Sequence, residues 1–232
     1  MVAKDRNSAL TRRGACGAIA GAALTASLAP SVAWAESRPQ QMLEKARIAV
    51  TALMADDNFP QLGAFIREAK AVLIVPELLK GGFILGGEGG SGVLVVRGPD
   101  GVWGYPVFYN MGGGSIGAQI GGQVSQLVLT IMREEGLDAL LRTKATAGVD
   151  FSVAAAKAGV GYDARTGVAL DADMYAFSRN QGLYLGGALE GNVFVPRKDW
   201  NDLFYEVGAT TLDIIDGRYP RTQADRLRAV LP

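Results

Sequence analysis

Ser115 is the residue whose setting most resembles that of a catalytic nucleophile. Residues 113–117 match G-x-S-x-G, which in α/β-hydrolases places a serine on a sharp turn between a strand and a helix. Such a serine needs a histidine base, and the chain contains no histidine. Residues 118–123 alternate like a strand and do not begin a helix. We therefore expect a glycine-permitted bend here, with a hydrolase as the alternative.

Two glutamates, Glu88 and Glu190, follow similar glycine-rich segments at residues 82–87 and 182–187. Two carboxylates about 5–10 Å apart would suit a glycosidase, which is the second form of the hydrolase alternative. An acid beside apolar strands needs a hydrogen-bonding or charged partner. We therefore expect two structural acids that bind backbone amides or an arginine.

Two other patterns suggest ligands that the rest of the sequence does not support. Residues 87–92 and 112–117 match G-x-G-x-x-G, but each runs into a strand and lacks the helix that would hold a dinucleotide pyrophosphate. Asp171 and Asp173 share one face of an expected strand, with no histidine or clustered third ligand beside them. We expect neither a cofactor nor a metal site.

The first 35 residues have the layout of a secretory signal peptide. A basic segment over residues 4–13 precedes an apolar run over residues 15–29, and residues 33–35 supply an A-x-A cleavage site. We expect cleavage after Ala35 and a single domain over residues 36–232. The mature protein would then be exported to the periplasm or cell envelope, peripheral to the membrane.

Composition excludes two classes of function for the remaining domain. The chain carries 23 basic and 23 acidic residues, and the leader removes more basic than acidic ones, so no bulk basic field for nucleic acid remains. No run of about 18 apolar residues follows the leader, so we expect no helix that spans a bilayer. The only cysteine, Cys16, lies in the leader, so the domain has no disulfide.

Helical periodicity marks both ends of the domain, and strand patterning fills its middle. We expect helices over residues 38–55, 60–70, 134–142, 199–207, 211–215 and 222–231. We expect strands over residues 71–75, 82–85, 92–97, 102–109, 115–123, 127–132, 151–158, 168–177, 182–190 and 192–195. The Gly-Pro-Asp-Gly sequence at residues 98–101 predicts a turn that pairs the strands on its two sides.

Glycine occupies 16 of the 42 positions from residue 81 to residue 122. Glycine costs backbone entropy in strands and is tolerated where a sheet bends, bulges or brings two backbones close together. We therefore expect an α+β fold, in which a curved, barrel-like antiparallel sheet is flanked by N-terminal and C-terminal helices.

The helix expected over residues 38–55 is amphipathic and allows two interpretations. Its apolar stripe can pack on the sheet, or it can enter a membrane interface while neighbouring cations meet lipid phosphates. The apolar contacts of the second interpretation are Met42, Leu43, Val50, Leu53 and Met54, and the cations are Lys45, Arg47, Arg67, Lys70 and Lys80.

The order of segments along the domain resembles that of the SYLF domain. The segments that carry the resemblance are AVLIVP at 71–76, KGGF at 80–83, GGE at 86–88, GVL at 92–94, WGYP at 103–106, GGSIGAQIG at 113–121, SQLVL at 125–129, YAFSR at 175–179, GLY at 182–184 and LEG at 189–191. The resemblance covers nearly all of the expected mature chain, and it is the combination of segments that is specific.

The resemblance implies a non-catalytic module that binds phospholipids, often anionic ones, with the basic positions of the N-terminal helix as contacts. Eukaryotic members couple lipid binding to actin, and actin is an improbable partner for an exported protein. The expected partners are therefore anionic phospholipid membranes. The alternatives are the hydrolase at Ser115 or at Glu88 and Glu190, and a structural envelope factor that binds other proteins.

Overall fold

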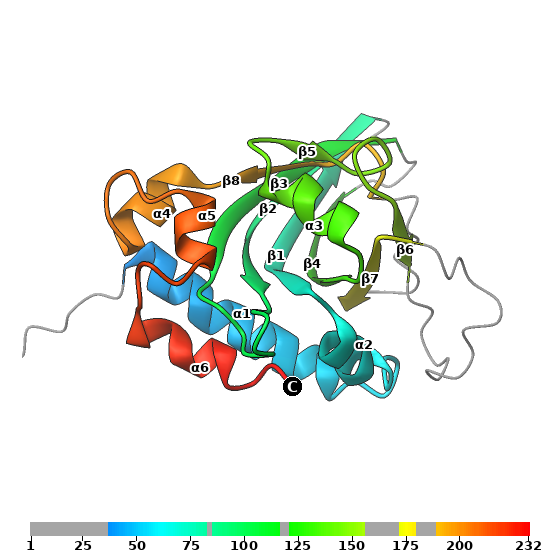
Figure 1. Cartoon of the computed structure of the whole chain (residues 1–232). Coiled ribbons are helices and arrows are strands. Elements are labelled where there is room, and N and C mark those ends of the chain that lie inside the picture. Colours follow the sequence, from blue (N-terminus) through cyan, green and yellow to red (C-terminus); the bar gives the residue numbers. More distant parts are fainter. Residues whose placement is uncertain (1–36, 83–84, 117–120, 156–171, 180–188) are drawn as a thin grey trace, which may run out of the picture. The chain divides into compact units, whose positions relative to one another are not determined.

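A computed structural model describes residues 37–82, 85–116, 121–155, 172–179 and 189–232, all in the compact unit Glu36–Pro232 (Figure 1). The predicted signal peptide, Asp171 and most of the strand expected over residues 182–190 lie outside these ranges. No helix within them is long and apolar enough to cross a membrane.

An eight-stranded sheet forms the centre of the domain and curls into an open half-barrel (Figure 1). Its spatial order is β5-β8-β3-β2-β1-β4-β7-β6, and all neighbours pair antiparallel except β6 and β7. The strands are β1 (Ala71–Gly82), β2 (Leu85–Val96), β3 (Val107–Ile116), β4 (Gly121–Ile131), β5 (Ala145–Thr146), β6 (Val153–Ala155), β7 (Met174–Arg179) and β8 (Val193–Pro196). The predicted α+β class with a curved antiparallel sheet is confirmed.

Helices precede, interrupt and follow the strands. They are α1 (Arg38–Met54), α2 (Leu62–Glu68), α3 (Glu134–Leu141), α4 (Lys198–Phe204), α5 (Thr211–Ile215), the 3₁₀ helix η3 (Thr222–Ala224) and α6 (Asp225–Arg228). Figure 1 shows α1, α4 and α6 gathered on one side of the domain, and α1 contacts both α4 and α6.

The two faces of the sheet carry different helices. On the outer face, the ring of Phe108 packs edge-on against Trp200 and Phe204 of α4, and Lys45 of α1 reaches Glu77 of β1. On the inner face, the hydroxyl of Tyr109 donates a hydrogen bond of 2.7 Å to the carbonyl oxygen of Leu140 in α3. Burial raises the pKa of the Tyr109 hydroxyl, which keeps it a neutral donor.

The covered half of the sheet is buried on both faces. Consecutive residues of β1 from Ala71 to Pro76 are buried, as are Val93 to Val96 of β2 and Leu127 to Ile131 of β4. Such continuous apolar runs are typical of strands that pack against other elements on both sides.

β1 continues through Pro76 to Gly82, whereas the sequence predicted a strand that ends at residue 75. The pairing of β1 shifts register on both sides around Pro76, so this residue faces a β-bulge where no backbone N–H is required. Gly90 and Gly92 of β2 lie opposite this bulge. A Cβ at Gly90 would come within 2.6 Å of the carbonyl oxygen of Glu77, so the bulge requires glycine at that position.

The strand expected over residues 115–123 is also wrong. Ser115 lies in β3, and the next described strand, β4, begins at Gly121 and runs back beside β1 instead of continuing β3. The turn at residues 98–101 does join paired strands, as predicted, with Gly101 at a φ of 79° and β2 antiparallel to β3.

Candidate functional site

Ser115 lies within a ladder of paired strands. Its backbone pairs with Gly86 of β2, one residue before β3 ends at Ile116. The next described element is a strand, whereas a nucleophile elbow requires a helix directly after the serine. The backbone at this position is therefore that of the strand ladder and not of a hydrolase elbow.

The carboxylate of Glu88 is bound by two polar side chains in the folded domain. Its side chain is fully buried and lies 2.6 Å from the ammonium group of Lys80, which is its cross-strand neighbour. The side-chain amide of Asn192 donates a second hydrogen bond to the same carboxylate. The sequence prediction named backbone amides or an arginine as partners, and Lys80 and Asn192 are two side chains that it did not name.

Glu190 is exposed, unlike Glu88. A buried, ion-paired carboxylate and an exposed one do not form two matched groups facing a shared substrate space. The glycosidase alternative therefore has no support from the placement of these two side chains.

The side chain of Asp173 forms hydrogen bonds with Ser152. Its carboxylate accepts hydrogen bonds of 2.8 Å from both the backbone N–H and the hydroxyl of Ser152. Within the described ranges, no group of three or more histidine, cysteine, aspartate or glutamate residues is arranged to hold a metal ion.

Four of the five predicted lipid-binding cations have carboxylate partners. Lys45 lies 2.8 Å from Glu77, Lys70 lies 2.6 Å from Glu134, and Lys80 binds Glu88. Arg47 binds Glu44 three residues earlier in α1, and this bond lowers the pKa of the Glu44 carboxyl. The fifth, Arg67, is exposed at the end of α2. The basic positions are thus spread over several elements.

The apolar stripe of α1 packs on the sheet. Met42 and Leu43 are 7% and 3% exposed, while Val50 and Leu53 are completely buried. Met54 packs against the same core from a partly buried position. The first interpretation of this helix therefore describes the folded state.

Five residues of α1 are exposed, and four of them, Arg38, Gln41, Lys45 and Ile48, form what we term the exposed row, while Thr51 follows one turn later. The four positions of the exposed row follow the spacing i, i+3, i+7 and i+10, so they lie along one side of the helix. Arg38, Gln41 and Lys45 also line an open groove, together with Leu79 of β1 and Trp200 of α4. Leu79 is 59% exposed, which places an apolar side chain next to two cations.

Another cation, Arg197, packs against Trp200 in the lining of this groove. The guanidinium group of Arg197 stacks 3.6 Å from the centre of the Trp200 ring and donates a 2.8 Å hydrogen bond to the hydroxyl of Ser91. Sequence reasoning missed Arg38, Trp200 and Arg197. Helical spacing from Lys45 could have found Arg38, but α4 meets α1 only through the tertiary fold.

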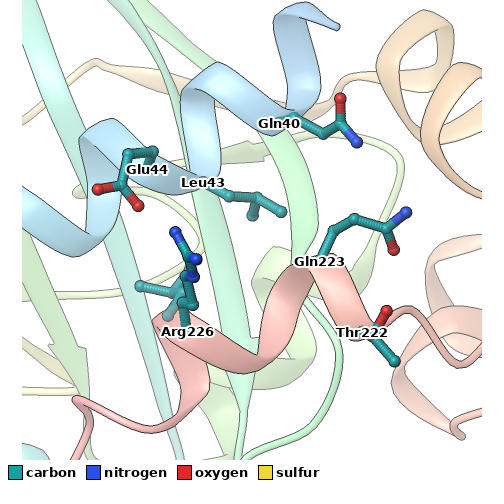
Figure 2. A pocket seen from close by; sticks show the side chains of 7 residues that line it. Gln40, Leu43, Glu44, Thr222, Gln223 and Arg226 are labelled. Atoms are coloured by element: carbon teal, nitrogen blue, oxygen red, sulfur yellow. The ribbon is translucent and has the colours of Figure 1, made fainter. Parts of the chain in front are cut away.

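A second hollow lies between α1 and the segment formed by η3 and α6. Figure 2 shows Gln40 and Glu44 of α1 facing Gln223 and Arg226. Acid, base and amide groups share this space, and Glu44 is already bound to Arg47. The mixture makes this hollow a poor site for an anionic ligand.

Comparison with known proteins gives one family match. Residues 112–232 match the model of the family Ysc84, described as "Las17-binding protein actin regulator". Among curated proteins, the human SH3 domain-containing YSC84-like protein 1 is 32% identical over 168 residues, which is 72% of this chain and 49% of that protein.

Two fungal proteins show similar likeness. The SH3 domain-containing protein PJ696.02 of Schizosaccharomyces pombe is 33% identical over 163 residues, 68% of this chain and 38% of its own length. LAS seventeen-binding protein 3 of Saccharomyces cerevisiae is 30% identical over 170 residues, 72% of this chain and 37% of its own length. The alignments thus span less than half of these relatives, and no solved structure matches the chain.

Proposed function

Because this chain belongs to the Ysc84 family, the SYLF-type family that its sequence resembles, we propose that it is a non-catalytic module that binds anionic phospholipid surfaces. The observation that carries the proposal is the exposed row of α1, where Arg38 and Lys45 stand beside the exposed side chains of Ile48 and Leu79. Cations next to apolar side chains suit the boundary between phosphate groups and acyl chains.

The ion pair of Lys45 leaves this cation available to lipid. Lys45 and Glu77 are about half exposed in their side chains, 48% and 52%. An exposed pair of this kind stabilises a protein by about 0–1 kcal/mol, whereas a basic residue at an anionic membrane gains about 1 kcal/mol. A lipid phosphate can therefore compete with Glu77 for this ammonium group.

The exposed row can bind without any rearrangement of α1. For Met42, Leu43, Val50 and Leu53 to reach acyl chains, α1 must leave the sheet. Exposing four such side chains costs about 6–12 kcal/mol, which is similar to the whole stability of a typical domain. We infer that the closed domain makes first contact, and that the buried stripe follows only if acyl chains replace its core contacts in the same step.

Vesicle flotation of the full chain tests this function. The variant Arg38→Gln with Lys45→Gln removes two surface cations without touching the core. Its partitioning onto vesicles rich in phosphatidylserine is expected to fall by about 2 kcal/mol, or roughly 30-fold. Higher salt should weaken wild-type binding and reduce the difference between the two proteins.

The matched control is Arg142→Gln with Lys144→Gln, which makes the same change in net charge at two exposed positions after α3. We expect this control to bind almost like the wild type. The proposal fails if the folded wild type does not bind anionic vesicles at low salt. It also fails if the control loses as much binding as the α1 variant.

Export to the cell envelope is part of the same proposal and rests on the leader-like residues 1–35. The description of the family names actin regulation and Las17 binding, and an exported location would separate this chain from those partners. Fractionation of cells that express the full chain, with N-terminal sequencing, should find it outside the cytosol and beginning at Glu36. A cytosolic chain that keeps its first residues would contradict this part.

A further inference from the structure

Glu77 is an acid in the lining of the groove beside α1. Among the described residues that line this groove, it carries the only negative charge, while Arg38 and Lys45 carry positive charges. Both oxygens of its carboxylate accept hydrogen bonds from the ammonium group of Lys45, at 3.0 and 2.8 Å. A carboxylate at this position repels anionic lipid and holds one of the two cations that would attract it.

The β-bulge of β1 fixes the backbone of Glu77. The pairing of β1 with β2 shifts register between Ile74 and Glu77, and Glu77 pairs with Ser91 directly after the shift. The carbonyl oxygen of Glu77 also packs closely on Gly90, where a Cβ would come within 2.6 Å of it. Lys45, by contrast, reaches the pair through a flexible four-carbon stem from the surface of α1. Lys45 is therefore the partner that can turn from the pair toward lipid.

Breaking this pair leaves no buried charge behind. The side chains of Lys45 and Glu77 are 48% and 52% exposed, so water can replace each lost partner. The pair of Lys80 and Glu88 is the opposite case, because the side chain of Glu88 is fully buried and needs its cation. Lys45 can thus alternate between Glu77 and an external phosphate group.

Building on the proposed lipid-binding function, on which this step rests, we propose that Glu77 is a built-in competitor for Lys45 that restricts binding to strongly anionic membranes. The apparent affinity falls with the fraction of molecules in which Lys45 is unpaired. Where anionic lipids are sparse, the pair stays closed. Where they are dense, several phosphate groups around Arg38 and Lys45 outweigh one carboxylate.

Flotation of the full chain on phosphatidylcholine vesicles with increasing fractions of phosphatidylserine tests this competition. Glu77→Gln keeps the size and polarity of the side chain and removes its charge. The variant should bind about fivefold more tightly than the wild type, which corresponds to the upper limit for an exposed ion pair. It should also reach half-maximal binding at a lower fraction of phosphatidylserine.

Glu134→Gln is the matched control. Glu134 lies 2.6 Å from Lys70, and the two side chains are 63% and 40% exposed, so the variant breaks a similar ion pair and makes the same change in net charge. Neither residue lines the groove. This control should bind almost like the wild type. A Glu77→Gln variant that gains no more affinity than the control overturns the competition.

A double-mutant cycle separates competition from net charge. Lys45→Gln should weaken binding more in the Glu77→Gln background than in the wild type, by up to about fivefold, because only the wild-type Lys45 is already held by an acid. If the net charge of the groove were the whole effect, Lys45→Gln would weaken binding equally in both backgrounds. Equal losses therefore contradict the competition.

Failure of the competition and failure of lipid binding give different results. A wild type that binds anionic vesicles, with Glu77→Gln no better than the control, rejects the competition and leaves the lipid-binding function intact. If neither the wild type nor Glu77→Gln binds anionic vesicles at low salt, both are rejected. Binding of Glu77→Gln at a fraction of phosphatidylserine where the wild type stays unbound supports both.

Discussion

At the scale of single residues, glycine has two different roles in neighbouring strands. At Gly90 and Gly92 the bulge around Pro76 leaves no space for a Cβ. At Gly81 and Gly114 a Cβ would meet no atom within 4 Å in the part of the chain that the structure describes. Composition alone cannot separate these roles, because both kinds of glycine occur in the same apolar strands.

Alanine substitution should separate the two roles. Gly92→Ala would drive a methyl group into the carbonyl oxygen of Ile74 and should cost about 3 kcal/mol or more. Gly81→Ala should leave the free energy of unfolding unchanged or raise it by about 0.5 kcal/mol, because it restricts the unfolded chain. Urea denaturation measures both. Equal losses for the two variants would contradict the distinction.

The pair formed by Lys80 and Glu88 should show the asymmetry of a buried charge. Lys80→Met removes the ammonium group that lies 2.6 Å from the fully buried Glu88 carboxylate, and should cost about 3 kcal/mol. Adding Glu88→Gln removes the buried negative charge and should recover part of that loss. Chemical denaturation measures the free energy of unfolding of the two variants and so checks which of them is more stable. A double variant less stable than Lys80→Met would contradict this prediction.

At the scale of elements, α1 combines a core-forming stripe with an exposed row that faces solvent. If first contact with lipid uses the closed domain, the amides of α1 near Val50 and Leu53 should exchange hydrogen slowly both with and without anionic vesicles. Hydrogen exchange followed by mass spectrometry gives this comparison. Rapid exchange of these amides only when vesicles are present would show that the helix leaves the sheet on binding.

Local patterns predicted those elements whose signals lie within one segment. The stripe of α1, the helix α3 and the turn at residues 98–101 follow from periodicity and turn chemistry. Pro76 and residues 115–123 were assigned wrongly because their structure depends on pairing. A bulge supported by two neighbouring strands accommodates the proline, and the ladder places Ser115 in one strand and Gly121 in the next.

The candidate site was only partly predictable for the same reason. Lys45 could be selected from the sequence because it lies on an amphipathic helix. Its partner Glu77, and Trp200 across the groove, belong to elements that meet α1 only in the folded domain. Tertiary contacts decide which basic side chains stay exposed and which are paired with a carboxylate.

At the scale of the whole molecule, the absence of histidine predicts a flat stability profile near neutral pH. The chain has no group of that type to titrate between about pH 5 and pH 8. Hydrogen bonds lower the pKa of four carboxyls in the folded state: Glu44 through Arg47, Asp56 through Asn58, Asp202 through Lys198, and Asp213 through Thr210.

Because these pKa values are lower in the folded than in the unfolded state, acid is expected to reduce the stability of the protein. The unfolded carboxyls titrate near 4.5 for glutamate and 3.8 for aspartate, so the stabilisation is fully present above those values. It is lost as pH falls further, through the lowered pKa values of the folded state. Thermal unfolding should show a constant melting temperature from pH 5 to pH 8 and a decrease below about pH 4. A steep change around pH 6.5 would contradict the prediction.

Short strands form the two edges of the half-barrel. The outermost strands in the described sheet are β5, with two residues, and β6, with three. Strands this short offer few unpaired backbone groups to a passing chain, which hinders the side-by-side growth that builds fibrils. A protein with such short edge strands would therefore resist runaway polymerisation even at high local concentration.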